Sequence, residues 1–180
     1  GSRTQERPRH CAICALVAAA RNQVGYWKSD LALWTHTLER GGENNFIAHT
    51  KLGTALADLG RFEPALRQYT EALRITPEID EAHSRLGLIY FKQGQLGEAM
   101  VHYNQAIRIN PGFAQAYINR GALWGTMGKP DRAIEDFRKA LEMYPDNAEA
   151  KYNLGLALTE AGRTDEAIAL LDTLAEGNPE

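Results

Sequence analysis

The residues best suited to chemistry are a few cysteine and histidine side chains near the start of the chain. Cys11 and Cys14 form a CxxC pair, and His10 comes directly before them. Such a pair serves redox chemistry in a thioredoxin-like βαβ setting, which is not visible here. A zinc site would need two further ligands nearby, and His10 alone does not supply them. We therefore interpret both cysteines as small apolar side chains on a packed helix.

A second candidate is the pair His49 and His83, which lie 34 residues apart. Two histidines in one register could bind a metal ion, but no carboxylate or thiolate completes the site, and we expect them to pack against a neighbouring helix. The chain has no glycine-rich phosphate loop, HExxH motif or nucleophile elbow. We predict no catalytic residues, no cofactor, no metal and no enzyme activity.

The composition limits the classes of function. The chain has 180 residues, of which 44% are hydrophobic and 24% charged, as in a folded globular protein. The net charge of −3 argues against nucleic-acid binding, because phosphate contacts need a basic excess. The longest apolar run, residues 11–20, is about half the roughly 20 residues that cross a membrane. We expect a soluble domain that does not insert into a membrane, either cytoplasmic or on the outer face of a membrane-anchored parent.

The strongest signal in the sequence is an internal repeat of 34 residues. Small residues, an aromatic position and a proline recur in phase over four units. The series are Gly53, Gly87, Gly121 and Gly155; Gly60, Gly94, Gly128 and Gly162; Ala65, Ala99, Ala133 and Ala167; Tyr69, Tyr103, Phe137 and Leu171; and Pro77, Pro111, Pro145 and Pro179.

Each series has a physical reason. The first glycine and the alanine fit where two antiparallel helices touch, since a larger side chain would force the helix axes apart. The second glycine follows the first helix, where a left-handed residue ends it. The proline cannot continue the second helix. Asp146 followed by Glu149 indicates the N-terminal cap of the last unit's first helix.

These residues resemble the tetratricopeptide repeat family, whose unit has the same length and the same order of small, aromatic and proline positions. The resemblance implies an all-α fold, a right-handed superhelix of antiparallel helix pairs. We predict repeats at residues 46–79, 80–113, 114–147 and 148–180, after a degenerate capping helix pair at residues 10–45. Residues 1–9 are expected to be a tag scar, Gly1-Ser2, and a flexible N-terminus.

A shorter resemblance covers residues 23–30. This stretch is similar to the junction that precedes tetratricopeptide repeats in bacterial membrane glycosyltransferase-like proteins. It implies, as one alternative, that the chain is a substrate-positioning appendage of such a protein.

The family resemblance also implies where a ligand would bind, namely along the first helices of the pairs. Asn119 and Asn153 resemble the asparagine ladder of O-linked N-acetylglucosamine transferase repeats, and an asparagine side chain can pair with one peptide unit of an extended ligand. Alternatively, these asparagines hydrogen-bond a neighbouring helix. The residues that we predict to line a peptide-binding groove are Lys51, Arg85, Asn119, Asn153, Leu88, Phe91, Ile118 and Tyr152.

We accordingly predict a non-catalytic scaffold that binds a protein or peptide partner in this groove. The alternative is a module for homo-oligomerisation, because the last helix pair would expose apolar residues unless something covers them. The residues expected to be exposed there are Ala167, Leu170, Leu171 and Leu174. Self-association through the terminal helix pairs would follow.

Overall fold

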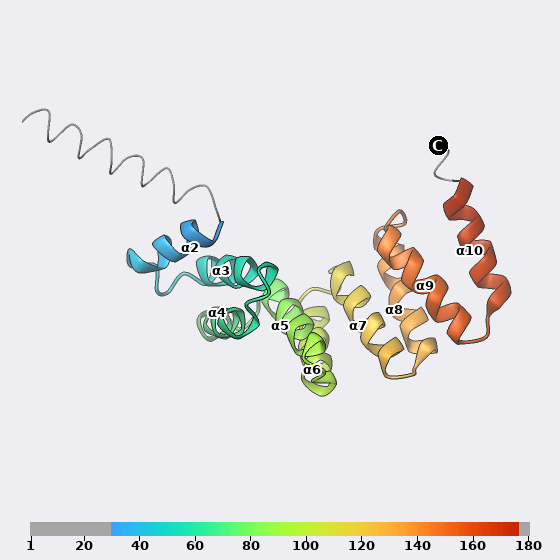
Figure 1. Cartoon of the computed structure of the whole chain (residues 1–180), viewed down its shortest axis with the longest axis horizontal. Helices are drawn as coiled ribbons and strands as arrows, with labels where there is room; N and C mark the ends of the chain where they lie inside the picture. The colour runs from blue at the N-terminus through green and yellow to red at the C-terminus, as the bar shows by residue number, and fades with distance from the viewer. Residues whose placement is uncertain (1–29, 177–180) are drawn as a thin grey trace, which may run out of the picture. The chain divides into compact units, whose positions relative to one another are not determined.

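The computed structural model describes residues 30–176, with side chains up to residue 170, and this range contains helices and no strand (Figure 1). The predicted all-α class, a helical repeat solenoid, is confirmed. Cys11, Cys14, the first helix of the expected capping pair and nearly all of residues 23–30 lie outside the described residues. The chain divides into two compact units, Gly1–Ile75 and Thr76–Glu180, and each is described by itself.

The first unit contains three described helices. They are α2 (Asp30–Glu39), α3 (Phe46–Asp58) and α4 (Phe62–Ile75). Helix α3 packs against both α2 and α4. It begins after Asn45, whose side-chain oxygen accepts a hydrogen bond from the backbone N–H of Ala48 at 3.1 Å and so satisfies one of the unpaired donors of the first turn.

The second unit contains three helix pairs. They are α5 (Asp80–Lys92) with α6 (Leu96–Ile109), α7 (Ala114–Thr126) with α8 (Pro130–Met143), and α9 (Ala148–Glu160) with α10 (Thr164–Glu176). Each helix packs against the next along the chain, and the first helices also contact one another, α5 with α7 and α7 with α9. This second set of contacts lines up the first helices on one face of the unit.

The repeated glycines occupy the two positions that the sequence assigns them. The four turn glycines all have positive φ, between 67° and 75°, which an L side chain rarely adopts. Three of the four helical glycines, Gly53, Gly87 and Gly121, lie against an aromatic ring: a Cβ on Gly87 would lie 2.6 Å from Cε1 of Tyr103, and one on Gly121 would lie 2.7 Å from Cε1 of Phe137. Glycine at these helical positions allows the two helices of a pair to approach closely.

Two predictions near the C-terminal end need correction. Asn147, and not Asp146, caps α9, because its side-chain oxygen accepts from the backbone N–H of Ala150 at 2.8 Å. Ala167 is buried and Leu170 packs partly against the core, because α10, which carries both residues, packs against α9. The side chains of Leu171 and Leu174 lie outside the described residues. No helix among the described residues is long and apolar enough to cross a membrane.

Candidate functional site

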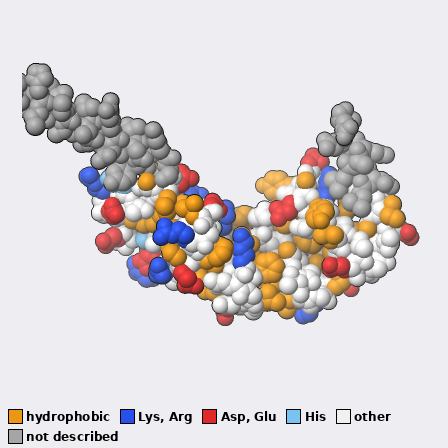
Figure 2. Space-filling view, viewed as in Figure 1, with side chains coloured by type: hydrophobic (Ala, Val, Ile, Leu, Met, Phe, Trp, Pro, Cys, Tyr) orange, Lys and Arg blue, Asp and Glu red, His pale blue; other side chains and the backbone are white. Residues whose placement is uncertain are grey.

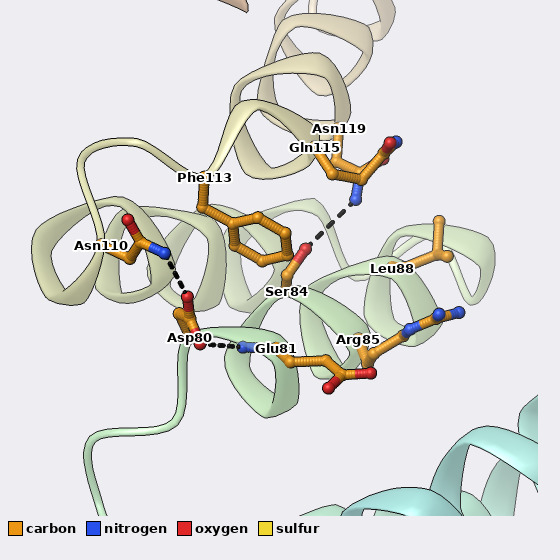
Figure 3. A pocket seen from close by; sticks show the side chains of 9 residues that line it. All are labelled: Asp80, Glu81, Ser84, Arg85, Leu88, Asn110, Phe113, Gln115 and Asn119. Carbon is orange, nitrogen blue, oxygen red and sulfur yellow. Dashed lines mark hydrogen bonds between the residues drawn. The ribbon is translucent and has the colours of Figure 1, made fainter. Parts of the chain in front are cut away.

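A hollow with a volume of about 560 Å³ lies between α5 and α7 (Figure 3). Side chains on one face of α5 form one side of it, and α7 with the loop before it forms the other. Residues three or four apart on a helix share a face, which brings the lining side chains of each helix together. The lining residues are Asp80, Glu81, Ser84, Arg85, Leu88, Asn110, Phe113, Gln115 and Asn119.

A polar network connects the two helices across this pocket. The Asn119 side chain donates to Oγ of Ser84 at 3.3 Å (Figure 3), and its oxygen accepts from the Gln115 amide at 3.2 Å. One of the two amide N–H groups of Asn119 and one lone pair of its oxygen therefore stay available for a ligand. Asn119 thus hydrogen-bonds a neighbouring helix, one of the two roles that the sequence left open, and it also lines the pocket.

Two charged residues of the pocket, Asp80 and Arg85, differ in whether they have a partner within the described part of the chain. At the N-terminal end of α5, Asp80 accepts from the Asn110 amide at 2.6 Å and from the backbone N–H of Glu81 at 2.8 Å. Arg85, one turn further along, forms no ion pair within the described part of the chain. A guanidinium with five donors and no acidic partner is suited to a carboxylate from outside.

A second, smaller hollow lies between α7 and α9, with a volume of about 290 Å³. Small side chains of α7 form one wall, and polar or apolar side chains of α9 form the other. The lining residues are Gly121, Ala122, Gly125, Thr126, Ala133, Phe137, Asn153, Leu156, Ala157 and Glu160. Both hollows therefore open along the first helices of the second unit.

The structure brings only some of the predicted groove residues together. Arg85, Leu88 and Asn119 line the first pocket, and Asn153 lines the second. Tyr152 is 60% exposed on α9. Lys51 is partly buried on α3, in the other unit.

Two apolar residues of the predicted groove face the interior instead. Ile118 is 1% exposed and belongs to the core shared by α7, α8 and α9, so its assignment to the groove is corrected. Phe91 is partly buried and packs against a cluster formed by Ala99, Tyr103 and Leu123. The reason is that neighbouring first helices pack against one another, α5 with α7 and α7 with α9, and cover the side chains that point from one of these helices toward the next.

Some lining residues are not among the groove residues that the sequence analysis named. Glu81 and Gln115 occupy the second position of their units, and Phe113 ends the loop before α7. The second position was open to prediction, because it lies one turn before the asparagine position on the same helical face. The loop residues Asn110 and Phe113 carry no repeat signal of this kind.

The histidines hydrogen-bond to the second helix of their own pair. Nδ1 of His49 lies 2.8 Å from the Gln68 side chain, and Nδ1 of His83 lies 3.0 Å from Nδ1 of His102. Nε2 of His83 donates to the Pro77 carbonyl at 3.1 Å, so its Nδ1 accepts the His102 proton. Burial, and secondly the charge of His83, lower the pKa of His102 from 6.5 to about 4. Within the described residues no three metal-ligating side chains come together.

An ion pair joins α7 to α8 within one helix pair, and a hydrogen bond from the same arginine reaches α6 of the preceding pair. Arg120 donates two hydrogen bonds to Asp136, at 2.8 and 2.7 Å, and a third to the Asn104 side chain at 2.7 Å. Hydrogen bonding to Asp136 raises the pKa of Arg120. The contacts join α6, α7 and α8, and we assign this ion pair a structural role.

Comparisons with known protein families agree with this architecture. A tetratricopeptide repeat family model matches residues 125–180, and a TPR repeat model matches residues 53–94 and 87–128. The chain belongs to the tetratricopeptide repeat family. No curated protein sequence matches it significantly.

Solved structures of other tetratricopeptide repeat proteins have the same fold. A crystal structure of MamA is 26% identical, has a TM-score of 0.73, and the match covers 87% of this chain and 90% of MamA. The YrrB structure, described as a TPR protein with an unusual peptide-binding site, is 22% identical with a TM-score of 0.71, over 81% and 75% of the two chains. The first TPR of Spaghetti (RPAP3), bound to the HSP90 peptide SRMEEVD, is 22% identical with a TM-score of 0.63, over 67% and 95%.

Proposed function

We propose that this tetratricopeptide repeat chain is a non-catalytic scaffold that binds an extended segment of a partner protein along α5, α7 and α9. The observation that carries the proposal is the pocket between α5 and α7, where Arg85 and Asn119 face the same hollow. Tetratricopeptide repeats generally present their ligand surface on a continuous row of helices. The RPAP3 and YrrB structures, whose descriptions name a bound peptide and a peptide-binding site, support this class of function.

The side chains of the pocket suit a peptide of defined chemistry. The remaining N–H and lone pair of Asn119 can pair with one peptide unit, whatever the ligand's sequence. Arg85 can hold an acidic side chain or a terminal carboxylate through two parallel hydrogen bonds. Leu88 and Phe113 add apolar surface, which supplies most of the binding energy at such contacts.

The test is an affinity capture that compares the parent chain with a variant carrying Arg85→Ala, Asn119→Ala and Asn153→Ala. Proteins held by the groove should be lost with this variant and retained with a control carrying Arg67→Ala and Arg108→Ala, which alters exposed residues of second helices. Circular dichroism must show that all three are equally helical. If the parent and the triple variant capture the same proteins, binding along the first helices is wrong.

Self-association is a second candidate, favoured by the apolar surface of the last helix pair. Tyr152 is 60% exposed, Leu156 48% and Ile168 53%. Figure 2 shows hydrophobic side chains reaching the surface over α7–α9. A second copy of the chain covering this surface would bury it. Light scattering should then show a mass that rises with concentration, and Tyr152→Ser with Ile168→Ser should reduce it; a constant monomer mass for the parent contradicts this candidate.

A further inference from the structure

The hollow between α7 and α9 has an apolar floor that is buried beneath it. Ala133, Phe137 and Ala157 form this floor, and each is at most 3% exposed. Ala122 and Gly125 of α7 leave the space above the floor open. The hollow therefore ends on side chains of the core.

The preceding helix pair fills the corresponding space with one of its own side chains. There, Phe91 packs against the buried cluster that Ala99, Tyr103 and Leu123 form. One repeat later, 34 residues on, the residue in the place of Phe91 is Gly125. The counterparts of Ala99, Tyr103 and Leu123 are Ala133, Phe137 and Ala157, the floor of the hollow. The third repeat therefore has the receptor surface for an aromatic ring but lacks the ring.

The fold does not require a glycine at residue 125. Gly121, one turn earlier, is required, because a Cβ there would lie 2.7 Å from the Phe137 ring. A Cβ on Gly125 would meet no atom within 4 Å, and its φ is not positive. Glycine in a helix is less stable than alanine, so its presence here leaves room at a cost in stability. Open space above an apolar floor is what a ligand side chain needs.

We propose that this hollow, the α7–α9 pocket, receives an aromatic side chain of the peptide segment bound along the first helices. The proposal rests on the proposed function and names the partner's chemistry. Asn153 lies at the pocket and hydrogen-bonds no other side chain in the described part of the chain, so its amide is available to the ligand backbone. Glu160 is the one charged residue that lines the pocket. A lysine or arginine next to the aromatic residue of the ligand would complement it.

The test uses a phage-displayed library of random peptides, selected on the parent chain, with affinities of the enriched, fluorescein-labelled peptides measured by fluorescence polarisation. We expect the enriched peptides to share a Phe, Tyr or Trp beside a Lys or Arg. The decisive variant carries Ala122→Leu and Gly125→Phe, which places the residues of the preceding repeat, Leu88 and Phe91, in the pocket. It should bind these peptides at least about tenfold more weakly, because one anchoring side chain contributes on the order of a tenfold or larger change in Kd.

Two further variants control the result. Gly97→Phe adds the same ring to α6, where a Cβ also meets nothing within 4 Å, and should leave binding unchanged. Glu160→Lys keeps the apolar pocket and should turn the selection from basic to acidic neighbours of the aromatic residue. This second readout decides the proposal even if the filled variant fails to fold; an unchanged selection overturns it.

The failure of this inference can be told apart from failure of the proposed function. If filling the pocket leaves affinity unchanged while Arg85→Ala with Asn119→Ala weakens it, the groove binds a peptide but the α7–α9 pocket does not take its aromatic residue. If the selection enriches no peptide that these substitutions affect, both proposals are wrong. If filling the pocket instead dissociates a dimer of the parent, its occupant is a second copy and the peptide partner is wrong.

Discussion

The hydroxyl of Tyr69 in α4 lies 3.1 Å from Oγ1 of Thr54 in α3. Tyr103 is the counterpart of Tyr69 in the next repeat, but the counterpart of Thr54 in that repeat is Leu88, which has no hydroxyl. The Tyr103 hydroxyl is consequently buried without a hydrogen-bond partner among the described residues, and burial raises its pKa. In the third repeat the ring is Phe137, which has no hydroxyl to satisfy.

Tyr103→Phe should therefore stabilise the protein, whereas Tyr69→Phe should destabilise it. Removing an unpaired buried hydroxyl recovers about 1 kcal/mol or more, while losing a paired one costs about 1 kcal/mol. Phe137 shows that a phenylalanine ring fits this register. Urea unfolding of both variants gives the two changes in unfolding free energy. Equal destabilisation by the two substitutions would contradict the assignment of Tyr103 as unpaired.

How far the sequence predicts this molecule depends on whether a feature is local. The turn glycines and the close approach of Gly87 to Tyr103 repeat in sequence because each repeat needs them for its own helix pair. The fold could therefore be predicted from these repeated residues and the family resemblance that they carry. Ile118 and Phe91 were assigned to the groove because the family resemblance places their positions in the repeat unit there. That position does not show whether the next first helix covers a side chain.

The repeat pattern also does not predict the shapes of the pockets. Each is formed between two helix pairs, so its shape depends on residues about one repeat apart. The sequence shows that the counterpart of Phe91 in the next repeat is Gly125. Only the packing of Phe91 in the structure shows which space the glycine leaves unfilled. The same holds for Arg120 and Asp136, which lie in different helices and whose pairing no periodicity predicts.

The ion pair of Arg120 and Asp136 gives a second prediction. Asp136 is 8% exposed in its side chain, so Arg120→Leu leaves a buried charge without its partner and should cost about 3 kcal/mol or more. The double variant, Arg120→Leu with Asp136→Leu, should recover most of this loss, because the preceding and following repeats carry Leu86 and Leu154 in the place of Arg120. Chemical unfolding of parent, single and double variants measures this coupling. Additive losses would show that the two side chains act independently.

The histidine pair predicts how stability depends on pH. Because burial lowers the pKa of both His83 and His102, in the latter to about 4, both are neutral in the folded protein at pH 7. Unfolded histidine titrates near 6.5, so the unfolded chain binds more protons as pH falls from 6.5 toward 4, and the stability of the folded state should fall over that window. His102→Gln should reduce this pH dependence, because it recreates the pair of His49 with Gln68. Unfolding free energies at several pH values from 7.5 to 4 test this, and identical slopes for parent and variant would contradict it.

Two alanine substitutions in the first helices test which glycines the helix packing requires. Packing requires Gly87 but does not require Gly125. Gly87→Ala should destabilise the protein by about 1–3 kcal/mol, because the added methyl group would lie 2.6 Å from Cε1 of Tyr103 and force the helices of this pair apart. Gly125→Ala should instead stabilise it by about 0.5–1 kcal/mol, the ordinary gain of alanine over glycine in a helix, because its methyl group enters open space. Thermal and urea unfolding followed by circular dichroism compare the two. A loss of stability in Gly125→Ala would mean that the fold needs this glycine, and the space above Phe137 would then have a structural cause.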